Sequence, residues 1–148
     1  MSKDNFAKPR HSQEDIMSNP CPCGSGLPFS DCCNRFLDGE QQSRTAEELM
    51  RSRYTAYVQK RIDYLCDTLW PKKQPFFDEH GVARWASDNH WTGLKVVDAR
   101  NGGPSDREGT VLFEAKYLAG GQLHTHRELS LFRKKAGRWF YVEALPEG

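Results

Sequence analysis

The sequence lacks a long apolar run, and no stretch approaches the roughly 18 consecutive apolar residues that a membrane-spanning helix needs. Residues 1–19 contain no apolar segment of the kind found in secretory signals, so we expect a cytoplasmic location and no membrane contact. An excess of either charge is also missing, because 21 basic and 20 acidic residues give a net charge of +1. Without a strong positive charge, we do not expect nucleic-acid binding.

Several familiar catalytic signatures are absent as well. The sequence has no Ser-His-Asp arrangement, no phosphate-binding glycine loop and no dinucleotide-binding fingerprint. Its 148 residues fit one domain with a small appendage. These features leave open whether the protein is an enzyme, and they do not indicate an oligomeric state.

Composition divides the chain into three segments. Residues 1–18 are polar and mixed in charge, which predicts a disordered tail. Residues 19–40 are rich in cysteine, glycine and proline, which is typical of a compact, loop-rich knuckle. Residues 41–148 contain most of the aromatic side chains and are predicted to form the folded domain.

The first part of that domain has helical patterns. Thr45 and Glu48 form a capping-box pattern at the start of a first helix. Asp63 is expected to cap a second helix, which Pro71 would end. Residues 78–87 are predicted to form a third, shorter helix.

From residue 91 onward the apolar period changes to two, which predicts strands separated by glycine turns. The predicted strands cover residues 91–100, 111–117, 123–132 and 139–144. Three helices followed by a four-stranded antiparallel meander define the α+β class. We therefore predict three helices packed on a curved sheet.

Four of the five cysteines lie within 13 residues, at Cys21, Cys23, Cys32 and Cys33. Four thiolates supply the tetrahedral shell that zinc prefers, and they leave no position open for catalysis. We therefore predict a structural Zn²⁺ site, with iron, a redox pair or unligated cysteines as alternatives. We expect the knuckle to fold separately, so that Cys32→Ser would leave the domain after Thr45 intact.

The knuckle resembles a known motif. Cys21-Pro-Cys-Gly-Ser-Gly, followed by Phe29 and then Cys32-Cys33, is similar to the SEC-C motif, which is named for the C-terminal tail of the SecA translocation motor. In SecA the motif is a small zinc structure that contacts partner proteins. The resemblance implies a protein-interaction module, and this is our first functional hypothesis.

A second resemblance covers most of residues 20–142. The segments that carry it are Leu49-Met-Arg-Ser-Arg-Tyr-Thr-Ala-Tyr57, Asp63-Tyr-Leu65, Pro71, Trp91, Gly93-Leu94, Glu128-x-Ser130-x-Phe132 and Gly137-x-Trp139-x-Tyr141. These segments resemble the uncharacterised YchJ-like bacterial family, and the resemblance implies that the main domain is similar to the cone-shaped nuclear-transport-factor-two fold. The chain departs from some relatives in having one SEC-C copy, and in having Trp70 where a histidine can precede the proline.

A cone-shaped sheet encloses a pocket, which gives an alternative function: small-molecule binding, or an isomerase or dehydratase activity. On the third strand, the resemblance favours the face that carries Glu128 and Ser130. In an apolar pocket Glu128 would have a raised pKa and act as acid or base, unless it pairs with an arginine of the first helix. The candidate pocket residues are Arg51, Arg53, Tyr54, Trp91, Glu128, Ser130 and Trp139.

Overall fold

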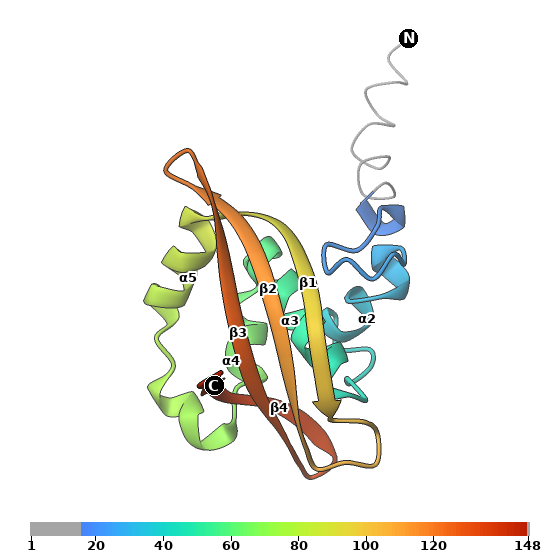
Figure 1. Cartoon of the computed structure of the whole chain (residues 1–148). Coiled ribbons are helices and arrows are strands. Elements are labelled where there is room, and N and C mark those ends of the chain that lie inside the picture. The colour runs from blue at the N-terminus through green and yellow to red at the C-terminus, as the bar shows by residue number, and fades with distance from the viewer. Residues whose placement is uncertain (1–15, 148) are drawn as a thin grey trace.

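The computed structural model describes residues 16–147 and has the predicted α+β architecture, with helices against one face of a four-stranded antiparallel sheet (Figure 1). The predicted disordered tail lies outside the described residues as far as residue 15. Within residues 16–147, no helix is long and apolar enough to cross a membrane.

The helical elements precede the sheet, and the strands pair in chain order. This order confirms the predicted meander, and the strands are slightly longer than the alternation indicated. The helical elements are η1 Phe29–Asp31, α2 Asn34–Leu37, α3 Ala46–Gln59, α4 Ile62–Asp67, η2 Pro71–Phe76 and α5 Glu79–Asp88. The strands are β1 His90–Asn101, β2 Glu108–Ala119, β3 Gln122–Lys135 and β4 Arg138–Leu145.

Of the helices α3, α4 and α5, two have a side chain that caps the N-terminus. Thr45 caps α3, because its hydroxyl accepts a hydrogen bond from the Glu48 N–H at 3.0 Å. Asp78 caps α5 in the same way. For α4 the prediction was wrong: Arg61 occupies the N-cap, and Asp63 lies inside the first turn.

The second helix is also shorter than predicted, since α4 ends at Asp67 and not at Pro71. The Trp70 N–H donates to the Tyr141 carbonyl at 2.8 Å, and the Tyr141 N–H donates to the Thr68 carbonyl at 2.8 Å. Because this segment pairs with β4, it cannot continue the helix. Pro71 instead begins the short helix η2.

The sheet bends around α3 at irregular points in the strand pairing. The register shifts twice between β1 and β2, and once between β3 and β4, next to Phe132. Such bulges increase the local bend and twist of a strand. The face turned towards α3 includes Glu128 and Ser130, which confirms the face that the family resemblance favoured.

The knuckle packs into the same hydrophobic core as the domain. Its four metal-binding candidates are 6% exposed or less, and they cluster with residues of α3, such as Leu49, and of the sheet, such as Val111. The Sγ atom of Cys21 lies 3.8 Å from the Thr55 hydroxyl of α3. A knuckle that shares this core has no separate interior, so we now expect the two parts to unfold together.

The backbones of Gly102 and Gly109 lie in close contact near the β1–β2 turn, and this contact can be tested by substitution. A Cβ atom at Gly109 would collide with the backbone of Gly102, whereas one at Gly103 would lie 3.5 Å from the nearest atom, a carboxylate oxygen of Asp106. We expect Gly109→Ala to lower the free energy of unfolding by about 1–3 kcal/mol. Urea denaturation measures the change, and Gly103→Ala is the matched control. Equal effects of the two substitutions would contradict this packing.

Candidate functional site

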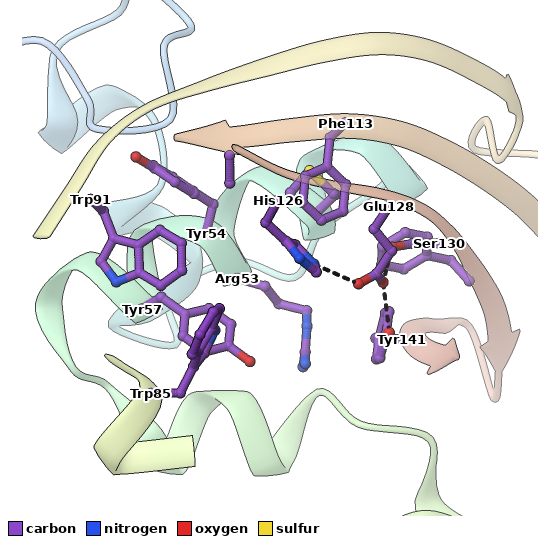
Figure 2. Close-up of a pocket in the computed structure, with 13 residues that line it drawn as sticks. Arg53, Tyr54, Tyr57, Trp85, Trp91, Phe113, His126, Glu128, Ser130 and Tyr141 are labelled. Carbon is purple, nitrogen blue, oxygen red and sulfur yellow. Dashed lines mark hydrogen bonds and ion pairs between the residues drawn. The ribbon is translucent and has the colours of Figure 1, made fainter. Parts of the chain in front are cut away.

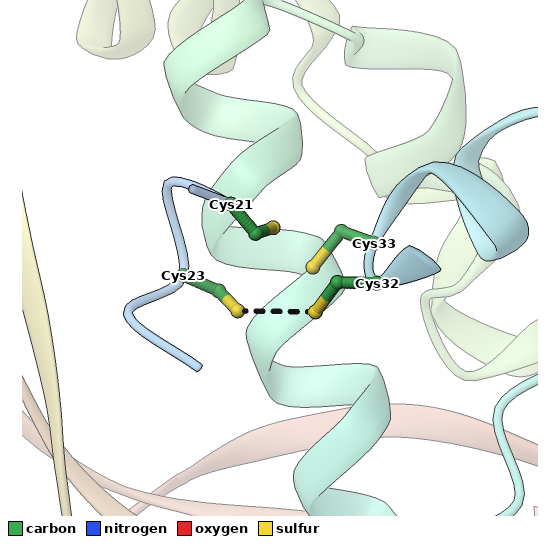
Figure 3. A group of neighbouring side chains, drawn as sticks. All are labelled: Cys21, Cys23, Cys32 and Cys33. Atoms are coloured by element: carbon green, nitrogen blue, oxygen red, sulfur yellow. Dashed lines mark hydrogen bonds between the residues drawn. The ribbon is translucent and has the colours of Figure 1, made fainter. Parts of the chain in front are cut away.

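The sulfur atoms of Cys21, Cys23, Cys32 and Cys33 converge beside α3 (Figure 3). They all lie within 4.8 Å of one another, and those of Cys23 and Cys32 are 3.6 Å apart. A tetrahedral ion with metal–sulfur bonds of about 2.3 Å places its sulfurs about 3.8 Å apart. The geometry of the cluster therefore fits a single metal ion.

A tight reversal of the chain brings the two cysteine pairs together. The Cys21 N–H donates to the Leu27 carbonyl at 2.8 Å, closing a loop between the first pair and η1. Gly24 and Gly26 turn this loop with φ values of 80° and 87°, which favour glycine. The second pair follows between η1 and α2, so the turn at the two glycines brings the first pair back towards it.

Burial and crowding oppose ionisation of the Cys32 and Cys33 thiols when no cation is present, whereas hydrogen bonds with Cys21 and Cys33 lower the pKa of Cys23. Burial raises the pKa of Cys32 to about 11, and the neighbouring Cys23 and Cys21 add to the rise while the Ser25 hydroxyl opposes it. Hydrogen bonding with Cys21 and Cys23, together with burial, raises the pKa of Cys33. Four thiolates in this space need a positive ion between them, which is the chemistry that a bound metal supplies.

Arg51 belongs to this cluster and not to the predicted pocket. Its Nη1 donates to the Cys23 carbonyl at 2.7 Å and lies 3.9 Å from the Cys23 sulfur, while its Nε pairs with Glu47 at 3.0 Å. Arg53 is two positions further along α3, about 200° around the helix, so it faces another side. The guanidinium of Arg51 offsets part of the negative charge of the thiolates.

A separate cavity of about 110 Å³ lies between the helices and the sheet (Figure 2). Five of the seven predicted pocket residues line it, and Arg51 and Trp139 do not. Its walls are formed by Met50, Arg53, Tyr54, Tyr57, Trp85, Trp91, Phe113, Ala115, His126, Glu128, Ser130, Phe132 and Tyr141.

Trp139 lies beyond the end of this cavity. Its indole N–H donates to the Arg44 carbonyl at 3.1 Å, next to the start of α3, and the side chain is almost fully buried. Two residues further along β4, Tyr141 reaches the cavity. The prediction of Trp139 as a pocket residue was therefore wrong, although it does lie on the predicted strand.

Glu128 is the centre of a polar network in the cavity wall (Figure 2). One carboxylate oxygen lies 3.0 Å from the His126 Nε2, and the other accepts hydrogen bonds from Ser130 at 2.6 Å and Tyr141 at 2.7 Å. Within the part of the chain that the structure describes, Glu128 forms no ion pair with either Arg51 or Arg53. Hydrogen bonds therefore replace the predicted arginine partner.

These bonds also reverse the predicted direction of the pKa shift. Burial by itself raises the pKa of Glu128, because its side chain is 16% exposed. Hydrogen bonds from His126, Ser130 and Tyr141 stabilise the charged form more strongly, so the pKa is lowered. Glu128 is therefore an ionised acceptor at neutral pH and not a proton donor.

The Arg53 side chain extends from α3 and forms part of the cavity wall. Its Nη1 donates to the Leu65 carbonyl at 2.8 Å and to the Thr68 hydroxyl at 2.6 Å. Its guanidinium carbon lies 4.7 Å from the centre of the Tyr141 ring, in a cation–π contact. Burial lowers the pKa of Arg53, while nearby Tyr57 opposes this shift.

Aromatic rings form the other wall of the cavity. Trp91 contacts Trp85 and Tyr57, each with ring centres 5.8 Å apart. Sequence analysis missed Tyr57, Trp85 and Tyr141 as pocket residues, because aromatic side chains at regular helix or strand spacing are equally typical of a core. His126 also lines the cavity, and Glu128 two residues later on β3 was the available signal for the contact between them.

Comparison with known proteins identifies the family to which the chain belongs. Residues 45–144 match the family described as "YchJ, middle NTF2-like domain", and residues 17–35 match the SEC-C motif. The chain belongs to the YchJ family. A UPF0225 protein of Geobacter sulfurreducens is 45% identical over 127 residues, which cover 86% of this chain and 79% of that protein. A UPF0225 protein of Actinobacillus succinogenes is 42% identical over 131 residues, covering 88% and 84%.

Two solved structures resemble this YchJ protein along most of its length. One is the solution structure of a SEC-C motif containing protein from Rhodopseudomonas palustris, with a TM-score of 0.80 and 35% identity over 86% of this chain and 98% of that one. The other is the crystal structure of a SEC-C motif containing protein from Psychrobacter arcticus, with a TM-score of 0.76 and 31% identity over 86% and 82%. These matches confirm the family and the fold predicted from resemblance.

The shared core predicts that metal and fold are lost together. Metal removal, or Cys32→Ser, should lower the melting temperature of the whole YchJ chain by about 10 °C or more, in one transition, since the loss of a buried metal site costs several kcal/mol. Circular dichroism follows the melt, and elemental analysis counts and identifies the metal. Cys66→Ser on α4, outside the cluster, is the control. A knuckle that melts separately from the sheet would contradict the shared core.

The Glu128 network predicts a pH-dependent contribution to stability. Because the pKa of Glu128 is lowered from about 4.5 on folding, its contribution is present above that pH and is lost as the pH falls through the lower folded value. We expect Glu128→Gln to lower the free energy of unfolding by about 1.5–3 kcal/mol at pH 7. The difference from the unmodified chain should shrink below pH 4.5.

Urea denaturation of both proteins at several pH values measures this difference. Glu108→Gln is the control, because Glu108 is an exposed carboxylate that pairs with Arg133 on the surface. Its substitution should change stability by less than about 1 kcal/mol. A difference for Glu128→Gln that stays constant with pH would show that its carboxylate charge is not what the network stabilises.

Proposed function

We propose that this YchJ protein binds a small organic molecule in the cavity between α3 and the sheet, and that the cysteine cluster holds a structural zinc ion. The observation that carries the first part is the ionised Glu128 network beside an open cavity with aromatic walls. Burying a charge is costly, and proteins often place such groups where a ligand must be recognised.

The donor set supports zinc as the metal. Four cysteine thiolates form a closed tetrahedral site, which is the usual arrangement for structural zinc and leaves no position for a substrate. The cysteines are almost fully buried against α3, so the metal is shielded from solvent as well. The proposed role of the ion is to hold the N-terminal segment on the domain.

The shape and lining of the cavity support ligand binding. Small-molecule sites are concave and mostly apolar, with a few polar groups that fix orientation. Here Arg53 and Glu128 are the charged groups among mainly aromatic and aliphatic side chains. The lowered pKa of Glu128 argues against it as a general acid, and hydrogen bonds already engage both of its oxygens, which disfavours it as a base. Binding is therefore proposed in place of an isomerase or dehydratase reaction.

A protein partner for the knuckle stays a prediction. The sulfurs face α3, so a partner would have to meet the outer surface, where Leu27 is 49% exposed. A cytoplasmic location also stays a prediction, and five free cysteines are in keeping with a reducing compartment.

The binding proposal can be tested with small probes of each charge. We would titrate the chain with phenol, benzamide, benzoate, benzamidine, isobutyrate and isobutyramide, and follow the four tryptophan indole N–H signals by nuclear magnetic resonance. Trp85 and Trp91 line the cavity, so their signals should shift with at least one probe. The signals of Trp70 and Trp139, which lie outside the cavity lining, should move less.

A cavity-filling substitution provides the matched comparison. Ala115→Leu adds volume inside the cavity and should abolish the shifts, whereas Ala99→Leu adds the same volume at an exposed position of β1 and should not. If no probe shifts Trp85 or Trp91, or if Ala115→Leu binds as before, the proposed site is wrong.

A further inference from the structure

Besides the buried indole N–H of Trp91, two further side chains of the cavity carry hydrogen-bond donors that no group within residues 16–147 accepts. The hydrogen bonds of Arg53 all come from Nη1, so its Nε and Nη2 have no partner within residues 16–147. The Tyr57 hydroxyl likewise has no hydrogen-bond partner among the described side chains and backbone. In Figure 2 the Tyr57 hydroxyl lies on the side of its ring that faces Arg53.

The acceptors of the cavity are already occupied. Glu128 accepts from Ser130 and Tyr141 and is bonded to His126, so its two oxygens have three partners. The side chains around the cavity therefore offer more donors than acceptors. The donors of Arg53 and Tyr57 are not among the fully buried atoms without partners, so they reach solvent through the cavity. A ligand that fills the cavity displaces this solvent and must bring acceptor atoms of its own, since donors buried without partners are costly.

The chemistry of Arg53 specifies which acceptor fits. Nε and Nη2 lie on one edge of the planar guanidinium, and this edge matches the two oxygens of a carboxylate. Nη1 is held by Leu65 and Thr68, and the ring of Tyr141 lies against the guanidinium, so that edge has a fixed direction. Burial in a cavity strengthens such a charge-assisted pair relative to one in water.

We propose that the ligand is a small carboxylate with an apolar or aromatic body. Arg53 binds its carboxylate through Nε and Nη2, Tyr57 donates a further hydrogen bond, and Trp85 and Trp91 pack against its body. This inference rests on the small-molecule site proposed above and names the class of ligand for it. An aromatic wall by itself also suits a cation, and the ionised Glu128 lines the same cavity. The charge of Glu128 is, however, already stabilised by hydrogen bonds with His126, Ser130 and Tyr141, whereas Arg53 keeps two N–H groups for a ligand.

The size of the cavity limits the ligand. A cavity of about 150 Å³ engineered into another protein holds benzene. At about 110 Å³, this cavity encloses the carboxylate and a short body, or the buried end of a larger molecule. Trp85 is 40% exposed, so the aromatic wall reaches the surface and a longer body can extend along it.

The experiment compares matched probes that differ in charge. Dissociation constants of benzoate, benzamide and benzamidine, and of isobutyrate and isobutyramide, are measured from the indole shifts of Trp85 and Trp91 in the full chain. Each carboxylate should bind about ten- to a hundredfold more tightly than its amide, the range expected for a hydrogen-bonded charge. Benzamidine should bind most weakly of the benzene derivatives.

Two variants test whether the preference for a carboxylate over its amide comes from the donors of Arg53 and Tyr57. Arg53→Gln should remove the preference for benzoate over benzamide, and Tyr57→Phe should weaken benzoate about two- to tenfold. Tyr57→Phe removes only a hydroxyl without a protein partner, so it decides the outcome if Arg53→Gln does not fold. Arg127→Gln is the control, because Arg127 pairs with Glu114 and Glu147 outside the cavity.

The outcomes separate this inference from the proposed function. If benzamide or benzamidine binds as tightly as benzoate, or if both variants keep the full preference, the carboxylate assignment is overturned while the binding site stands. If none of the probes shifts Trp85 or Trp91, the binding site itself is overturned.

Discussion

Helix α3 is the element on which the rest of the structure depends, because it must satisfy buried polar groups on two sides at once. Arg51 and Thr55, four residues apart, face the cysteine cluster. Arg53 and Tyr57, also four apart, face the cavity. The helical period of 3.6 residues keeps each pair on one side and separates the two sides. Helix α3 thereby positions both the cysteine cluster and the lining of the cavity.

The cavity side of this arrangement depends on one irregularity in the sheet. Leu131 pairs with Glu143, and regular pairing would then place Val142 opposite Phe132, but a register shift places Tyr141 there. Because partners across antiparallel strands point to the same face, the shift turns the Tyr141 side chain towards the cavity. Without it Glu128 would lose one of its hydrogen-bond donors. The bulge therefore contributes to the low pKa of Glu128, because it positions one of the hydrogen-bond donors of that carboxylate.

Sequence patterns predicted the features whose causes are local. The Thr45 cap depends on four consecutive residues, and the cysteine cluster depends on spacing within a short loop, so both were recognisable. The helix end before Pro71 and the partners of Glu128 depend on pairing with β4, far away in the sequence. A strand bulge leaves no clear local signal, so the hydrogen bond between Tyr141 and Glu128 could not be predicted from the sequence.

The same distinction explains why the contacts of Arg51 and Arg53 were harder to predict than their role of compensating buried polar groups. Sequence analysis grouped Arg51 with Arg53 as partners for a buried carboxylate, and both do compensate buried negative or polar groups. Their separation around α3 sends one to the cysteines and the other to the cavity. Since a helix moves as a rigid unit over a few turns, a metal that fixes Arg51 and Thr55 against the knuckle also restricts where Arg53 can point. On this argument a metal ion bound by the four cysteines would also support the cavity mechanically.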